Sequence, residues 1–232
     1  MSVKEQNIAS LTVVAKGLAE LAERVAFVGG ATIALYVDDQ GAADARITKD
    51  VDAVIELAGY TGFALLEARL RQLGFVNVDE PNAPICRWRF KGILVDIMPT
   101  DPAILGFSNR WYADAMAQRR KVEIAPGVSI FLFPLAYIIA TKLEAFAQRG
   151  RGDWLASNDL EDVVALFDGA TEIAAELAAT QGELRAYLRT ELAKLLRHPA
   201  PDQVVMAHLT PDAAIEHRAE RVMRLIAAFV GI

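Results

Sequence analysis

Two stretches of the sequence contain residue types that could together bind a phosphate group and a divalent cation. Gly29-Gly30 follows a short apolar segment, and Asp50 and Asp52 open the apolar run that continues to Leu57. In a strand alternate side chains share one face, so the two aspartates should project together. Neighbouring carboxylates repel each other, and a hard cation such as Mg²⁺ removes that repulsion while keeping coordination positions open for phosphate. We therefore expect phosphate on the glycine turn, whose backbone no Cβ covers, and metal on the acids.

A third carboxylate lies in the middle of another apolar segment. Asp96 is flanked by the apolar residues of the run Ile93–Met98. Burying an acid there is expensive unless a partner compensates its charge. The partner could be the same metal, or Asp96 could accept hydrogen bonds from backbone or arginine groups. For Asp50 and Asp52 the alternative is a pair of solvated acids at an exposed strand start.

The order of these residues resembles a known nucleotidyltransferase motif. Gly29-Gly30 followed by Arg46-x-Thr48-x-Asp50-x-Asp52 resembles the first motif of the DNA polymerase β-type superfamily. Within this superfamily the chain is most similar to the AbiEii/AbiGii toxin-type nucleotidyltransferases, over about residues 25–166. The resemblance implies two Mg²⁺ ions, with Mn²⁺ as an alternative, held by the aspartates at 50, 52 and 96. It also implies that the two glycines and Thr48 bind a nucleoside triphosphate.

A third motif follows in the second half of the chain. Lys142, Ala145 and Arg149 are spaced to share one helical face. A lysine in this apolar helix needs an anion, which could be a carboxylate or a triphosphate. The toxin-type family has a similar Lys-x-x-Ala-x-x-x-Arg helix and then an acidic motif, which Asp159 and Asp162 match. The resemblance implies a catalytic and nucleotide-binding role for Lys142, and nucleotide binding by Arg149 and Asp159. The alternative, compatible with the first, is an ion pair between Lys142 and one of these acids that joins two helices.

The sequence departs from the family pattern at two positions. Many superfamily members have Ser where this chain has Gly30, so a hydroxyl contact to phosphate is missing. The arginine that usually precedes the first acid of the last motif is Asn158 here. Both departures support an alternative in which the chain binds nucleotide or a partner without catalysing transfer.

Charge and composition restrict the class of partner. The chain has 24 Lys and Arg against 30 Asp and Glu, giving a net charge of −6. An acidic chain is unsuited to coating long nucleic acids, although a local basic groove could still bind them. The run Arg119-Arg120-Lys121 near Arg110 is either a solvated face or a contact to a polynucleotide backbone. Trp154, in a glycine-flanked loop, is the tryptophan that could meet a base.

The chain has the sequence features of a soluble cytoplasmic protein. No run approaches the about 18 apolar residues of a membrane span. Residues 1–5 lack the apolar segment of a signal peptide. A single cysteine, Cys86, excludes an internal disulfide. We therefore expect a cytoplasmic protein with no membrane partner.

The hydrophobic pattern predicts an α+β catalytic domain over residues 1–132 and a helical C-terminal domain over residues 133–232. Predicted strands are 25–28, 51–57 and 75–78, with hairpins 85–90/93–98 and 121–125/128–131. Predicted helices are 7–24, 31–36, 62–73, 109–119, 134–149, a helix capped by Asn158 or Asp159, and 211–229. Residues 38–45 and 99–108 are predicted loops.

The sequence therefore predicts a metal-dependent nucleotidyltransferase that moves a nucleoside monophosphate from a triphosphate to a hydroxyl. The acceptor could be RNA such as a tRNA 3′ end, a protein side chain or a small molecule. Family resemblance implies that the chain could be a toxin with an antitoxin partner. A less favoured alternative is a helical interaction module in which the acids lie far apart.

Overall fold

The chain divides by its internal contacts into two compact units. The computed structural model describes residues 1–39, 41–42, 46–57, 59–81, 83–150 and 152–232. The sheet unit consists of residues 1–34 and 46–134, and the helical unit consists of residues 35–45 and 135–232. The predicted domains divide the chain once, at 132/133, whereas the contact-based units group Phe133 and Pro134 with the sheet and the described residues 35–39 and 41–42 with the helices. The predicted loop at 38–45 lies in part outside the described residues.

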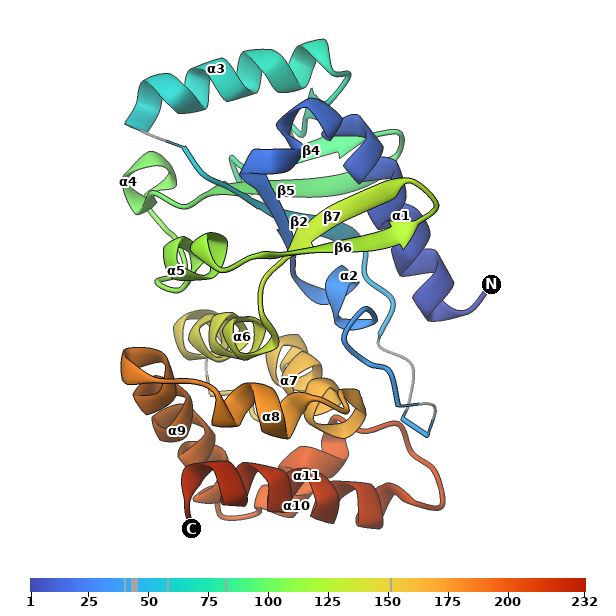
Figure 1. Ribbon diagram of the computed structural model, residues 1–232, viewed down its shortest axis with the longest axis vertical. Coiled ribbons are helices and arrows are strands. Elements are labelled where there is room, and N and C mark those ends of the chain that lie inside the picture. The colour runs from blue at the N-terminus through green and yellow to red at the C-terminus, as the bar shows by residue number, and fades with distance from the viewer. Residues whose placement is uncertain (40, 43–45, 58, 82, 151) are drawn as a thin grey trace. The chain divides into compact units, whose positions relative to one another are not determined.

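The sheet unit is built on seven strands in the order β3-β4-β5-β2-β1-β7-β6 (Figure 1). β2 runs parallel to β5, β1 runs parallel to β7, and the other neighbours are antiparallel. The strands are β1 (Val25–Val28), β2 (Asp50–Ile55), β3 (Val76–Asn77), β4 (Arg87–Phe90), β5 (Ile93–Pro99), β6 (Arg120–Ala125) and β7 (Val128–Leu132). This mixed sheet, with helices around it and a helical second unit, confirms the predicted α+β class.

Two hairpins fix the register of the outer strands, and both were predicted. β4 and β5 are joined by Lys91 and Gly92, which both have positive φ, at 47° and 85°. Positive φ at both central residues is the mark of the tight turn that matches strand twist. β6 and β7 form the second hairpin, with an irregularity between Glu123 and Ala125.

Helix α1 (Val3–Gly17) packs on the sheet through contacts with β2, β5, β6 and β7 (Figure 1). It begins with a capping box, in which Ser2 accepts from the Glu5 N–H and Glu5 accepts from the Ser2 N–H. The predicted single helix to residue 24 was wrong at its end, because residues 19–24 form the 3₁₀ helix η1 (Ala19–Arg24). The other helices of this unit are α2 (Gly30–Ile33), α3 (Gly59–Gln72), α4 (Pro102–Leu105) and α5 (Tyr112–Ala117).

The helical unit packs its helices around α6 (Leu135–Arg149), α7 (Asn158–Gly169) and α11 (Ile215–Val230). α6 begins directly after Pro134, as predicted. The predicted cap of α7 was wrong, because Ser157 precedes the helix and accepts from the Leu160 N–H. The remaining helices are α8 (Ile173–Ala178), α9 (Gly182–Leu196) and α10 (Pro201–Ala207). In the described part of the chain, no helix combines the length and apolar character needed to cross a membrane.

Cys86 lies just before β4 and is 2 % exposed. Burial, and then the negative charge of Asp96, raise the pKa of its thiol to about 12. Since the thiolate is the reactive form, we expect alkylation by iodoacetamide at pH 8 to be at least about 100-fold slower in the native protein than in denaturant. Mass spectrometry of time-resolved alkylation measures this ratio. Comparable rates in the two states would mean that the thiol is accessible.

Candidate active site

The sheet brings the three predicted acids to one face. Asp52 pairs in register with Asp96 across the parallel strands β2 and β5, and Asp50 lies two residues before Asp52 on the same side. On the other side of β2, Asp52 pairs with Val28, the last residue of β1. The end of β1, the start of β2 and the middle of β5 therefore meet at this face.

The predicted glycine turn lies directly against Asp52. Gly29 has φ of 75° and ψ of −172°, a backbone conformation that is almost restricted to glycine. A Cβ built on Gly29 would lie 1.8 Å from Oδ2 of Asp52. Glycine at this position is therefore required both by the backbone and by the close approach of the carboxylate.

A buried asparagine that sequence reasoning missed holds the loop before β2. Asn7 of α1 is 2 % exposed, and its Nδ2 donates to the carbonyl of Arg46 at 3.1 Å. Its Oδ1 accepts from the hydroxyl of Thr48 at 3.4 Å. The signal was available in principle, because Asn7 lies four residues before the buried Leu11 and so shares its helical face.

A second missed residue, Arg87, contacts two of the three acids. Its Nε donates to Oδ1 of Asp96 at 2.8 Å and its Nη2 donates to Oδ2 of Asp96 at 2.6 Å. The same Nη2 lies 3.3 Å from Oδ2 of Asp50. The hydrogen bonds to Asp96 raise the pKa of the Arg87 guanidinium above its ordinary value. The arginine alternative foreseen for Asp96 is thus what the structure shows.

The donor chemistry of this face suits a hard cation, because its three acids offer only carboxylate oxygens. Even so, no group of three or more His, Cys, Asp or Glu side chains among the described residues is arranged so that it could hold a metal ion. In the structure the Arg87 guanidinium donates to both oxygens of Asp96. A cation held by all three acids would have to share the Asp96 oxygens with Arg87 or displace its guanidinium.

The predicted residues of the third motif meet within the helical unit. Lys142 Nζ lies 2.6 Å from Oδ2 of Asp162 and 3.5 Å from Oδ1 of Asp159. Arg149 donates to both oxygens of Asp159, each at 3.0 Å. Lys142, Asp159 and Asp162 are all buried. The predicted ion pair between α6 and α7 is therefore present, while a role of these residues in nucleotide binding stays a prediction.

The comparison with protein families matches residues 14–228 to the family described as nucleotidyl transferase AbiEii toxin, type IV toxin–antitoxin system. The chain belongs to the AbiEii nucleotidyltransferase family. The resemblance inferred from the motifs is thereby confirmed. A comparison with curated proteins gives no match. Among solved structures, a candidate nucleotidyltransferase from H. pylori is similar, with a TM-score of 0.47, 11 % identity, and coverage of 98 % of this chain and 93 % of that chain.

The first departure from the superfamily pattern, Gly30, has a steric explanation in this AbiEii family member. A Cβ built on Gly30 would lie 2.6 Å from Cγ2 of Thr48 and 2.7 Å from Nη2 of Arg46. The loop before β2 thus fills the space that a serine side chain would need. The second departure, Asn158, is exposed at the first position of α7, and Asp159 receives its guanidinium contact from Arg149.

A larger ion-pair network of the helical unit was not foreseen from the sequence. Asp168 of α7 is 4 % exposed and contacts Arg218 and Arg221 of α11. Arg221 also pairs with Asp39, and Arg218 pairs with Asp212. The paired residues of this network are between 6 and 182 positions apart in sequence. No local sequence pattern therefore predicts these ion pairs. The network joins Asp39, which precedes β2 in the chain, to α7 and α11.

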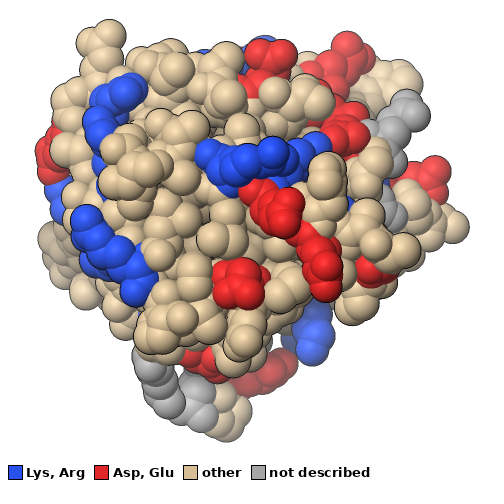
Figure 2. Space-filling view, turned by 90° about the horizontal axis from the view of Figure 1, so that it is seen from below, with Lys and Arg blue, Asp and Glu red and all other residues tan. Residues whose placement is uncertain are grey.

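The residues considered for nucleic-acid contact have packing partners. Trp154 packs edge-on against Phe146 and beside His198, and its carbonyl lies 2.9 Å from Nε2 of His208. Arg119 donates to the carbonyls of Met116 and Glu23, and Lys121 pairs with Glu23. On the face drawn in Figure 2, basic and acidic side chains lie in short neighbouring groups. A polynucleotide contact by the basic run stays a prediction.

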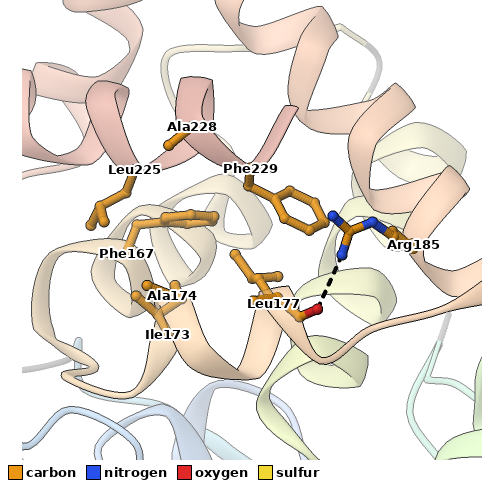
Figure 3. Close-up of a pocket in the computed structure, with 9 residues that line it drawn as sticks. Phe167, Ile173, Ala174, Leu177, Arg185, Leu225, Ala228 and Phe229 are labelled. Atoms are coloured by element: carbon orange, nitrogen blue, oxygen red, sulfur yellow. Dashed lines mark hydrogen bonds between the residues drawn. The ribbon is translucent and has the colours of Figure 1, made fainter. Parts of the chain in front are cut away.

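A small pocket of the helical unit is separate from the predicted site residues. It has a volume of about 190 Å³ and lies between α7, α8, α9 and α11. Figure 3 shows Phe167, Leu177, Leu225 and Phe229 around it, with Arg185 donating to the carbonyl of Ala178 at its edge. The lining contains none of the residues of the three motifs.

Proposed function

We propose that the chain is a Mg²⁺-dependent nucleotidyltransferase that moves a nucleoside monophosphate from a nucleoside triphosphate to an acceptor hydroxyl. The observation that supports it most is the meeting of Asp50, Asp52 and Asp96 on one sheet face beside the Gly29–Gly30 turn. Membership of the AbiEii family supports the same reaction class.

Each group of the site has a proposed task. Asp50, Asp52 and Asp96 would hold Mg²⁺ or Mn²⁺, which when bound lowers the pKa of an attacking hydroxyl and neutralises charge on the phosphates. The Gly29–Gly30 turn offers backbone that no Cβ covers to the triphosphate, and Asn7 positions the neighbouring Thr48. Lys142, Arg149 and Asp159 of the helical unit are proposed to bind the nucleotide as in the family motif, with Lys142 stabilising developing charge.

The acceptor and the biological role belong to the same proposal. The family description supports a toxin with an antitoxin partner. The proposed acceptor classes are an RNA such as a tRNA 3′ end, a protein and a small molecule. The acidic net charge of −6 favours a protein or small molecule over long RNA.

We expect Asp52→Asn to reduce label transfer by about 10³-fold or more, because it removes a charged ligand that faces both Gly29 and Asp96. The assay incubates each α-³²P nucleoside triphosphate and Mg²⁺ with bacterial RNA and lysate protein. The labelled species identifies the acceptor class. Asp114→Asn is the control, because Asp114 is an exposed residue of α5 outside the site.

A second candidate function is a nucleotide- or partner-binding protein of the same fold without catalysis. The contact of Arg87 with Asp96 and Asp50 favours it, since a cation of the chain already compensates these acids. Calorimetry with ATP and Mg²⁺ separates the two candidates. Nucleotide binding without label transfer from any nucleotide would support the binder and contradict the transferase.

A further inference from the structure

Arg87 is held against the acidic face by the geometry of the sheet. It pairs in register with Asp96 across the antiparallel strands β4 and β5, so both side chains point to the same face. The planar guanidinium takes both carboxylate oxygens of Asp96 and reaches Asp50 with the same Nη2. A single arginine is thus the charge partner of two proposed metal ligands.

The position of Arg87 also allows its side chain to move away from Asp96 and Asp50. It is the first residue of β4, and its side chain is 25 % exposed, compared with 11 % for the side chain of Asp96. A long side chain at a strand end can turn toward solvent without breaking the pairing of the sheet. Asp96 lies in the middle of β5, where its backbone is paired on both sides, with Asp52 of β2 and with Arg87 of β4.

We propose that Arg87 is an internal counter-ion that competes with the divalent cation for Asp96 and Asp50. This inference rests on the proposed function, since it concerns the same three acids. With Arg87 in place, the charges of Asp96 and Asp50 have a partner within the chain. A divalent cation on Asp96 must compete with the guanidinium for the carboxylate oxygens and is repelled by its charge, so Arg87 raises the cation concentration at which the site fills.

The test measures binding of Mn²⁺ to the full chain by the loss of the free-ion signal in electron paramagnetic resonance. We expect Arg87→Gln to bind Mn²⁺ about tenfold more tightly than the wild type, because a like charge beside the ligands is removed. Arg87→Lys keeps the charge and should stay within about threefold of the wild type. Equal or weaker binding by Arg87→Gln would overturn the inference.

Arg89→Gln provides a matched control. Arg89 lies two residues along β4 on the same face, but it pairs with the exposed Glu80. This variant removes the same charge from the same strand without touching the acids, so Mn²⁺ affinity should change by less than about twofold. If Arg89→Gln increased the Mn²⁺ affinity as much as Arg87→Gln, the effect would come from net charge, and a specific role of Arg87 would be overturned.

A second measurement needs no substitution at Arg87. In the wild type the ¹H–¹⁵N resonance of Arg87 Nε, bonded to Asp96 at 2.8 Å, should move as Mg²⁺ is added, and the Asp96→Asn variant assigns it. A resonance that does not shift while Mg²⁺ binds would overturn this inference and leave the proposed metal-dependent function standing. Failure of the wild type and of Arg87→Gln to bind either ion at millimolar concentration would overturn the metal-dependent function together with the inference.

Discussion

The Gly29→Ala variant should lose about 10²-fold of its nucleotidyl transfer activity and about 2–4 kcal/mol of its free energy of unfolding. The new Cβ would lie 1.8 Å from Oδ2 of Asp52, so the carboxylate must rotate or the ends of β1 and β2 must separate. The backbone at φ 75° and ψ −172° adds strain that alanine cannot relieve. Transfer of label from α-³²P nucleotides measures the activity, and urea unfolding followed by circular dichroism measures the stability.

Gly106→Ala is a control for positive φ alone, because Gly106 is in the ordinary left-handed region with ψ of 1°. Gly106 also has a φ of 75°, at the C-terminus of α4, but a Cβ there meets nothing within 4 Å. We expect this variant to lose about 1 kcal/mol of stability and to keep its transfer activity. If Gly29→Ala behaved like Gly106→Ala in both measurements, close contact between the turn and Asp52 would not matter for the reaction.

The strands of the sheet unit could be predicted because their signals are local. The two-residue spacing of Asp50 and Asp52 predicted a shared face, and Lys91-Gly92 predicted the β4–β5 hairpin. The same turn also fixes which residues of β4 and β5 lie opposite each other, and no prediction was drawn from that register. Counting outward from Lys91-Gly92 places Phe90 opposite Ile93 and Arg87 opposite Asp96. The pairing of Arg87 with Asp96 could therefore have been predicted from the sequence.

Other parts of the site depend on contacts between segments that are far apart in the sequence. Asn7 reaches the loop at Arg46 and Thr48 across about 40 residues of chain, and no pattern connects the two segments. The short extent of α2, Gly30–Ile33, was also not predicted, since the expected helix continued to residue 36. There the chain leaves the sheet unit, and Asp38 and Asp39 each donate a backbone N–H to the carbonyl of Gly169 in the helical unit.

The Lys142→Met variant should lose about 3–5 kcal/mol of its free energy of unfolding. Lys142 Nζ is 2.6 Å from Asp162, whose side chain is 2 % exposed, so the substitution leaves a buried carboxylate without this cation. Lys194→Met is the control, because Lys194 pairs with Glu191 at the surface and its side chain is half exposed. The control should lose less than about 1 kcal/mol in the same urea unfolding measurement. Similar losses in both variants would contradict a special role of the buried pair.

The double variant Lys142→Met/Asp162→Asn then distinguishes an ion pair that only joins α6 and α7 from a lysine that also binds nucleotide. Removing both charges should restore most of the stability, because no uncompensated carboxylate remains at position 162. Within the cluster the charges of Lys142 and Arg149 are balanced by Asp159 and Asp162, so a triphosphate must draw a cation away from a carboxylate. We expect calorimetry with ATP and Mg²⁺ to show about tenfold weaker binding in the stable double variant. Unchanged affinity there would assign Lys142 to the fold alone and leave Arg149, whose side chain is 71 % exposed, as the cation of this cluster available to the phosphates.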